Sequence, residues 1–350
     1  MKSSMITMRD IAVRAGVSRS TVSFVLNDKH SAMGVNEDTR RRVLEVASEL
    51  GYRRNELARA VVTGKNRVFG FVVPGFGLES EVVSRILAGV MDEAEARHYA
   101  VQVIRLARPD DEIIRRCVEL RPTGLLCIQT GPETLRHLRQ EVSRFGIPIA
   151  VLDSSPQLEG GSRVLSDDLA GCRQAIDHLA DLGHARIAYV GGDPKTVVSR
   201  LREEGYLAAM AGRHLPVLGG YVENGYWNAE ATEAATVRLL EDPEDAPSAI
   251  FCADDKTAMV VCRTARRLGR SVPGDLSVVG FADLAMAAYA DPPLTTVAQP
   301  FPEMGRVAVR RLLAAAAGET PPPEDPGVPL PDELVPTHLV VRRSTAAAHR

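Results

Sequence analysis

Polar side chains recur at helical spacing close to the start of the chain. Within residues 18–27 the apolar side chains share one side of a helix, which leaves Arg19, Ser20 and Ser23 on the other side. An arginine fork can pair with the O6 and N7 atoms of guanine, and a serine hydroxyl tolerates several base edges. Thr21 and Ser23, with the free amides of the helix start, suit phosphate oxygens. This chemistry is typical of a surface that reads DNA.

Two short helices joined by a tight turn would hold these side chains in place. Thr7 can cap the first helix, Asp10 completes a capping box, Gly16 supplies the turn and Ser18 caps the second helix. In a helix-turn-helix, the second helix presents its N-terminal residues to the major groove. The alternative for this segment alone is an ordinary helical hairpin with a solvated polar face.

A third helix and a charge asymmetry support the DNA-reading interpretation. The third helix is expected to start at Asn36 and to end at Gly51. Its arginine run 40–42 is either a solvated face or a phosphate contact. Residues 1–67 hold thirteen basic and seven acidic residues, a net charge of +6, whereas the remainder carries −9. This distribution indicates that the N-terminal part alone holds a polyanion.

The chain as a whole has the composition of a globular protein. Its 350 residues are 45% hydrophobic, which suits two or three compact units. The N-terminus has no apolar signal-peptide core, and no window approaches the ~20 apolar residues of a membrane span. We therefore expect a cytoplasmic protein without a membrane partner.

The cysteine and histidine patterns indicate neither metal nor redox chemistry. The five cysteines include no CxxC pair and lie mostly in apolar runs, which favours core thiols. The eight histidines include no HExxH motif, and His178 and His184 are expected to cap or pack. No cofactor and no metal are expected.

From residue 68 onward, short apolar runs alternate with amphipathic helical stretches. This order predicts parallel sheets with helices on both faces. Seven strands could form one wide sheet, but the chain length favours two similar lobes with a cleft between them. The expected strands span residues 68–73, 101–106, 125–128, 147–152, 187–190, 249–252 and 277–281.

Polar and aromatic residues follow several of these strands. Phe76 follows the first strand, Asp153 the fourth, Asp254 the sixth and Asp283 the seventh. Ligands of parallel sheets bind at the carboxyl ends of strands. Carboxylates together with an aromatic residue such as Trp227 suit a polyhydroxylated ligand, because sugar faces stack on rings while hydroxyls donate to oxygen. The competing interpretation of each aspartate is the N-cap of the following helix.

Motifs along essentially the whole chain resemble the lactose repressor (LacI/GalR) family of transcription regulators. The matching motifs are Ile11-Ala12-x-x-Ala15-Gly16-Val17-Ser18-x-x-Thr21-Val22-Ser23-x-Val25-Leu26-Asn27, Thr39-Arg40, Leu50-Gly51-Tyr52, Asp167-Asp168-x-x-Gly171, His178-Leu179-x-x-Leu182-Gly183-His184, Ser277-Val278-Val279-Gly280-Phe281 and Pro292-Pro293-Leu294-Thr295-Thr296-Val297. The resemblance implies an α/β sensor of two doubly wound parallel-sheet lobes, like periplasmic sugar-binding proteins, behind a small all-α helix-turn-helix headpiece. It further implies a homodimeric repressor that binds a near-palindromic operator in double-stranded DNA, modulated by a small, sugar-like effector between the lobes.

The resemblance also implies a division of the chain. A last edge strand is expected at residues 334–341, and a dimer is expected because a C-terminal heptad helix is absent. The implied domains are a headpiece at 1–54, a hinge helix and linker at 55–66, and a sensor at 67–350, with an N-terminal lobe of 67–163 and 294–328 and a C-terminal lobe of 164–293 and 329–345.

Departures from the family pattern limit what can be inferred about the operator. Asn55, Ala58 and Val61 align with the hinge helix that enters the minor groove, but Val61 replaces the usual leucine. Phe24 stands where many members carry a polar base reader, so its contact would be apolar. The expected DNA contacts are Thr7, Ser18, Arg19, Ser20, Thr21, Ser23, Phe24, Asn27, Asn55, Ala58 and Val61.

The effector site is likewise implied by the family, with one departure. Arg202 matches the family arginine that holds the effector, and its fork of donors suits vicinal hydroxyls or a carboxylate. Ala282 stands where the family has the first of two aspartates, which leaves room for a modified sugar, a phosphorylated metabolite or a weak effector response. The expected effector contacts are Phe76, Asp153, Arg202, Trp227, Asp254 and Asp283.

Two other classes of protein compete with a regulator. A transport binding protein would explain two lobes but requires export. A sugar-active enzyme would explain an acidic cleft, yet the sequence has no GxSxG motif, no Walker loop and no dinucleotide fingerprint after the first strand. We therefore expect no enzymatic activity.

Overall fold

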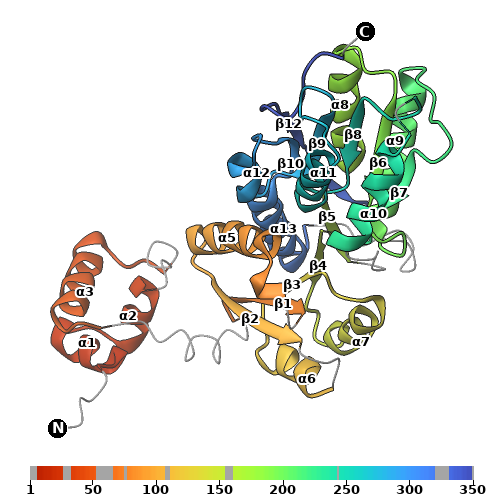
Figure 1. Ribbon diagram of the computed structural model, residues 1–350. Helices are drawn as coiled ribbons and strands as arrows, with labels where there is room; N and C mark the ends of the chain where they lie inside the picture. Colours follow the sequence, from red (N-terminus) through yellow and green to blue (C-terminus); the bar gives the residue numbers. More distant parts are fainter. Residues whose placement is uncertain are drawn as a thin grey trace. The chain divides into compact units, whose positions relative to one another are not determined.

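The computed structural model describes residues 6–26, 33–52, 66–74, 77–106, 111–153, 161–242, 244–319 and 331–348. The chain divides into two units, Met1–Gly64 and Lys65–Arg350, here called the headpiece and the two-lobed unit (Figure 1). Five predicted contact residues lie outside the described residues, namely Asn27, Asn55, Ala58, Val61 and Phe76.

Among its described residues, 6–26 and 33–52, the headpiece has the helices α1 (Met8–Ala15), α2 (Arg19–Leu26) and α3 (Glu37–Glu49). The N-caps of α1 and α2 are formed by the residues that the sequence predicts. The Thr7 amide and hydroxyl both donate to the Asp10 carboxylate, at 2.8 and 2.7 Å, and these bonds hold the pKa of Asp10 below its ordinary value. The Thr21 amide donates to Ser18 Oγ at 3.0 Å. These predicted caps are confirmed.

Apolar side chains from all three helices form the headpiece core. The buried members are Ile11, Ala12, Ala15, Val22, Val25, Val43, Val46 and Ala47. The basic run on α3 is largely paired within its own helix, because Arg40 contacts Glu37 and Arg41 contacts Asp38, each at 2.7 Å. This pairing supports the solvated-face interpretation of the arginine run.

The N-terminal lobe is built on a sheet in which every pairing is parallel. The strand order is β11-β5-β4-β3-β1-β2. The strands are β1 (Val68–Pro74), β2 (Ala100–Leu106), β3 (Gly124–Ile128), β4 (Ile149–Leu152), β5 (Ser162–Ser166) and β11 (Glu333–Val335). One face packs on α5 (Glu81–Ala96) and α13 (Phe301–Ala317), and the other on α6 (Asp111–Glu119) and α7 (Pro132–Ser143).

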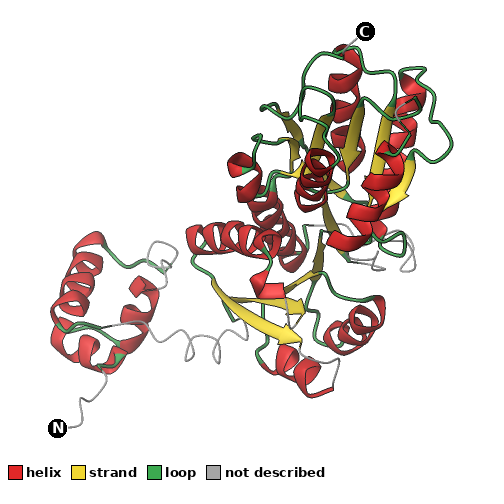
Figure 2. Ribbon diagram, in the orientation of Figure 1, coloured by secondary structure: helices red, strands yellow, loops and turns green. Residues whose placement is uncertain are grey.

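The C-terminal lobe repeats this layered arrangement (Figure 2). Its strand order is β12-β10-β9-β8-β6-β7, and only the β10–β12 pairing is antiparallel. The strands are β6 (Ile187–Gly191), β7 (Val222–Asn224), β8 (Ala249–Cys252), β9 (Ser277–Ala282), β10 (Thr295–Ala298) and β12 (His338–Val340). The helices are α8 (Asp168–Asp181), α9 (Val197–Gly212), α10 (Ala229–Leu240), α11 (Asp255–Arg267) and the short α12 (Ala285–Tyr289).

The chain crosses between the lobes three times: after β5, after β10 and between β11 and β12. The single last strand expected at 334–341 is wrong, because the segment splits at Pro336 and pairs with both sheets. The expected lobe boundaries also need correction. Strand β10 pairs with β9 in the C-terminal lobe, and β11 pairs with β5 in the N-terminal lobe. Hydrophobic periodicity marks such strands as buried but does not say in which sheet.

Helices α5 and α13 cross closely on the N-terminal lobe. A Cβ atom at Gly89 would lie 1.8 Å from the carbonyl oxygen of Pro302, and one at Gly305 would lie 2.3 Å from that of Ile86. Only glycine allows this backbone approach. The crossing holds α5 against the segment that enters from the C-terminal lobe.

The cysteines and His184 have structural roles. None of the five cysteines forms a disulfide and all are buried, and burial raises the pKa of the Cys262 thiol to about 12. His184 hydrogen-bonds Ser248 through Nδ1 at 2.9 Å and Ser277 through Nε2 at 3.0 Å. The predictions of core thiols and of a packing role for His184 are confirmed. None of the helices described is both long and apolar enough to cross a membrane.

Candidate functional site

The start of α2 presents the polar residues that the sequence singled out. Arg19 and Ser20 are exposed, whereas Thr21, Ser23 and Phe24 are half-buried. The Ser18 and Thr21 hydroxyls lie 2.9 Å apart within the cap. Arg19 and Ser20 therefore remain the most accessible side chains at the N-terminal end of this helix, where a helix-turn-helix reads bases.

A cleft of about 1000 Å³ lies between the two lobes. The structure brings Asp153, Arg202, Trp227 and Asp254 together in its lining. Asp153 and Asp254 lie there because they follow strands, as the sequence predicts. Asp283 is the exception, since it is not part of the lining. Its carboxylate instead accepts a hydrogen bond from Arg342 at 2.7 Å, so the structure does not place Asp283 at the cleft with the other predicted residues.

Arg202 is a buried cation at the base of the cleft, with 4% of its surface exposed. Its Nε donates to Asp168 at 2.8 Å, Nη1 to the Ala253 carbonyl at 2.6 Å and Nη2 to Gln299 Oε1 at 3.0 Å. Burial alone would lower the pKa of Arg202, but the Asp168 carboxylate raises it above its ordinary value. The guanidinium stays charged, and two of its five N–H groups are left over for a ligand.

The network around Arg202 joins two of the interlobe crossings. Gln299 lies between β10 and α13, and its amide donates to Ser166 Oγ at 2.6 Å at the end of β5. Ser166 in turn donates to Asp168 Oδ1 at 2.5 Å. A ligand that contacts Arg202 therefore contacts the group that holds these crossings together.

Trp227 forms one wall of the cleft. Its indole packs on Gly192, where a Cβ atom would lie 2.1 Å from the indole Cζ2 atom. The residue has a left-handed backbone conformation, with φ of 55°, and 39% of its surface is exposed. Glycine at 192 thus allows a flat aromatic surface to face the cleft, as a sugar or a base would require.

Asp254 is the N-cap of a helix, which is the alternative interpretation that the sequence allowed for it. Its carboxylate accepts the Thr257 amide at 2.7 Å and caps α11, while the residue also lines the cleft. Behind it, Asp255 is fully buried and accepts hydrogen bonds from Thr296 at 2.5 Å and from the Leu284 amide at 2.6 Å. Burial raises the pKa of Asp255 to about 7.

Sequence reasoning missed several residues of the lining. Gln129 follows β3 with φ of 48°, Lys195 precedes α9, Lys256 lies in the first turn of α11 and Gln299 precedes α13. Of these four residues, only the two lysines could have been noticed in the sequence, because lysine is rare in this chain. The glutamines follow ordinary buried strands, and nothing in their sequence context marks them.

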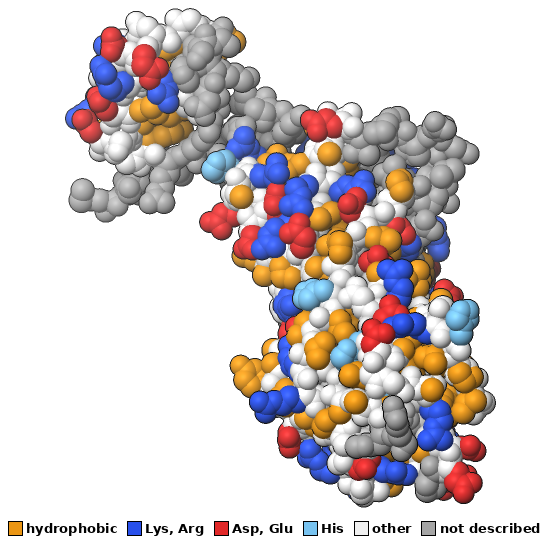
Figure 3. Space-filling model, turned by 90° about the horizontal axis from the view of Figure 1, so that it is seen from above, with side chains coloured by type: hydrophobic (Ala, Val, Ile, Leu, Met, Phe, Trp, Pro, Cys, Tyr) orange, Lys and Arg blue, Asp and Glu red, His pale blue; other side chains and the backbone are white. Residues whose placement is uncertain are grey.

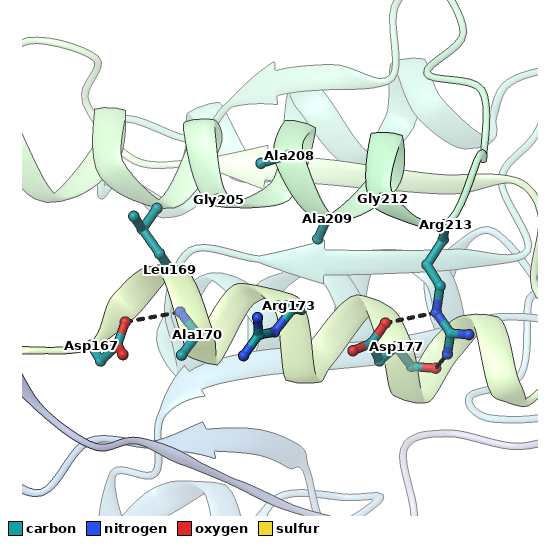
Figure 4. Close-up of a pocket in the computed structure, with 10 residues that line it drawn as sticks. All are labelled: Asp167, Leu169, Ala170, Arg173, Asp177, Gly205, Ala208, Ala209, Gly212 and Arg213. Carbon is teal, nitrogen blue, oxygen red and sulfur yellow. Dashed lines mark hydrogen bonds and ion pairs between the residues drawn. The ribbon is translucent and has the colours of Figure 1, made fainter.

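A second depression, of about 440 Å³, lies between α8 and α9 (Figure 4). Small residues of α9, Gly205, Ala208 and Gly212, form one side of it. Arg213 at its end is held by Asp177 at 2.6 Å. None of the predicted effector contacts lines this depression.

Comparison with known proteins assigns the headpiece and the two-lobed unit to one family. Residues 7–55 match the model of bacterial regulatory proteins of the lacI family, and residues 176–345 match the periplasmic binding protein-like domain. The regulator reg1 of Streptomyces lividans is 34% identical over 97% of both chains. The chain belongs to the LacI family. The repressor CytR of Escherichia coli is also similar, at 30% identity over 97% of this chain and 96% of its own.

Solved structures agree with this assignment to the LacI family. The lac repressor dimer bound to operator and an anti-inducer has a TM-score of 0.76 and 26% identity, over 98% of this chain and 99% of that one. The regulator CelR in complex with cellobiose has a TM-score of 0.67 and 28% identity, over 97% and 99%. This family member is accordingly a transcriptional regulator rather than an enzyme, and the predicted fold is confirmed.

Proposed function

We propose that this LacI-family regulator is a cytoplasmic, dimeric repressor that binds a near-palindromic operator and responds to a small, sugar-like effector in the interlobe cleft. The observation that carries the proposal is the position of Arg202. It lines the cleft and also bonds the groups that tie two interlobe crossings together. An effector acts by binding one arrangement of the lobes more tightly than the other.

The DNA contacts proposed for the headpiece are the polar residues at the start of α2, with Phe24 as an apolar contact. Residues 1–54 serve as the reader and 55–66 as the hinge. Support comes from the exposed Arg19 and Ser20 and from the net charge of +6 on residues 1–67. Phosphate contacts supply affinity and Arg19 supplies selectivity.

The surface of α11 and α12 suits a second copy of the chain. Met286 and Tyr289 on α12 are 39% and 89% exposed, and Leu268, which caps α11, is 42% exposed. Large apolar side chains that are exposed together mark protein interfaces. We assign this surface to the dimer.

The experiment that tests the function is capture of genomic DNA fragments by the full-length protein at near-physiological salt, followed by sequencing. Enrichment of a near-palindrome is expected. Arg19→Ala should cost about 1 to 3 kcal/mol of operator affinity and relax one position in each half-site. The control is Arg14→Ala, which removes an exposed arginine that pairs with Glu49 on α3. Capture without a shared motif would contradict operator reading, and uniform weakening by Arg19→Ala would make Arg19 a phosphate contact.

A further inference from the structure

Lysine is almost absent from this chain, and its distribution is uneven. Only five of its 42 basic residues are lysines. Beyond residue 65 lysine occurs twice, at Lys195 and Lys256, and both residues line the interlobe cleft. Every other basic residue in that part of the chain is an arginine.

Neither lysine is used to hold the fold. Both are exposed, and among the described residues no carboxylate lies within ion-pair distance of either ammonium group. Several arginines elsewhere do hold elements together. Arg306 pairs with Asp92 and Arg310 with Glu93, and both pairs join α13 to α5. On the face of the two-lobed unit drawn in Figure 3, basic and acidic side chains lie among one another.

The charge of the cleft lining is therefore unusual for this part of the chain. The lining carries three cations, Lys195, Arg202 and Lys256, against the two carboxylates of Asp153 and Asp254. Asp254 already accepts the Thr257 amide. The charge of Arg202 is balanced by its ion pair with Asp168, so the positive charge available to a ligand comes from the two lysines, within a region, residues 68–350, whose net charge is −9.

The helices that begin at the cleft add to this field. The starts of α7, α9, α10 and α11 all contribute lining residues. Gly131 precedes α7 and offers no side-chain cap to the amides of its first turn, which also holds Glu133. Helix starts carry partial positive charge and favour anions.

Ala282 removes negative charge at the same place. The residue lines the cleft at the end of β9, where the family resemblance places an aspartate. A carboxylate there would accept the hydroxyls of a neutral sugar and would repel an anion. The absence of this carboxylate and the presence of the two lysines both make the site more favourable to an anion.

We infer that the effector of this regulator is anionic: a sugar-like molecule that carries a phosphate or a carboxylate group. The anionic group binds Lys195 and Lys256, while the ring packs on Trp227 and approaches Arg202. Lysine suits this role because its ammonium is a compact charge on a flexible stem, which can follow a tetrahedral phosphate or a planar carboxylate. The inference rests on the proposed function in that it assigns the chemistry of the proposed effector.

Trp227 is the only tryptophan of the chain, so tryptophan fluorescence, excited where the seven tyrosines do not absorb, reports on this cleft. The first probe is inorganic phosphate, titrated into the full-length protein against chloride at equal ionic strength. We expect a phosphate-specific change in fluorescence and a rise in melting temperature. The double variant Lys195→Gln with Lys256→Gln should lose both responses, with circular dichroism showing that it is folded. The control Arg173→Gln, an exposed arginine on α8, should keep them.

The second set of probes compares a neutral sugar, glucose, with two anionic derivatives of it, glucose 6-phosphate and glucuronate. At least one anion should bind tenfold or more tightly than glucose, and this preference should fall to within twofold in the double variant. Preference for the phosphate ester or for the uronate identifies the anionic group. Equal responses to phosphate and chloride, equal or tighter binding of glucose, or an unchanged preference in the double variant would each overturn the inference.

Failure of the anionic effector can be distinguished from failure of the proposed function. Operator enrichment is measured without any ligand, so a regulator with a neutral effector would still bind its operator. Failure of the anion probes together with operator binding rejects only the anionic effector. Loss of operator enrichment rejects the proposed function, whatever the cleft binds.

Discussion

Arg85 of the N-terminal lobe donates a hydrogen bond from Nη1 to the carbonyl oxygen of Asp283 in the C-terminal lobe, at 2.9 Å. The same turn of α5 supplies Glu81, whose carboxylate accepts the amide of Ala285 at 2.9 Å. Asp283 has a left-handed backbone, with φ of 52°, and Ala282 before it has φ of 110° and lines the cleft. A strained segment at the cleft is thus held by a helix of the other lobe.

Replacement of Arg85 by alanine should weaken this interlobe contact. We expect the free energy of unfolding to fall by about 1 to 3 kcal/mol, because the partly buried carbonyl loses a charged donor. Urea denaturation measures the change. Arg97→Ala is the control on the same helix, since Arg97 makes an exposed ion pair with Glu93 and should cost under about 1 kcal/mol. Equal effects of the two variants would contradict a special role for Arg85.

Arg202→Lys should damage both stability and ligand binding. A single ammonium cannot reach Asp168, the Ala253 carbonyl and Gln299 together, as the guanidinium does. A loss of about 1 to 3 kcal/mol in unfolding free energy is expected, with loss of the ligand-induced change in Trp227 fluorescence. Arg213→Lys, an exposed residue just after α9, should leave both measurements nearly unchanged. A stable Arg202→Lys variant with full ligand response would refute the role assigned to the network.

Asp255 should give the protein a stability that depends on pH. The pKa of about 7 in the folded state lies above the unfolded value of 3.8, so the folded protein binds a proton that the unfolded chain has released. This stabilisation is complete below about pH 4 and is lost as the pH rises through 7. Asp255→Asn should flatten that part of the profile, by up to about 4 kcal/mol between pH 4 and 8. Parallel profiles of the two proteins, from urea denaturation at each pH, would disprove the prediction.

Gly192→Ala should displace the indole of Trp227. The added Cβ would fall 2.1 Å from the ring, so the ring must move, at a cost of about 1 to 3 kcal/mol in unfolding free energy. The fluorescence of the free protein should shift, and ligand affinity should fall. Gly219→Ala is the matched control, because a Cβ there meets nothing within 4 Å. An unchanged spectrum in Gly192→Ala would show that the indole does not pack as described.

The features that depend on interactions between near neighbours in the chain could be predicted from the sequence. The caps at Thr7 and Ser18, the buried side of α2 and seven of the nine strands described before residue 290 each depend on neighbours within one or two turns or on simple apolar runs. The sequence did not predict β5 and β7, which are short and partly polar. For the same reason the sequence could place Asp153 and Asp254 at strand ends, which meet at one edge of a parallel sheet.

Tertiary structure decided what depends on contacts between distant segments. Strands β10 and β11 are four and three residues long, too short for periodicity to assign them to a lobe, and only pairing with β9 and β5 does so. In the sequence, Asp283 follows a strand in the same way as Asp153 and Asp254. Only the structure shows that the Asp283 carboxylate is paired with Arg342. Lys195 and Lys256 lie 61 positions apart, and only the packing of α9 and α11 beside one cleft brings them to the same site.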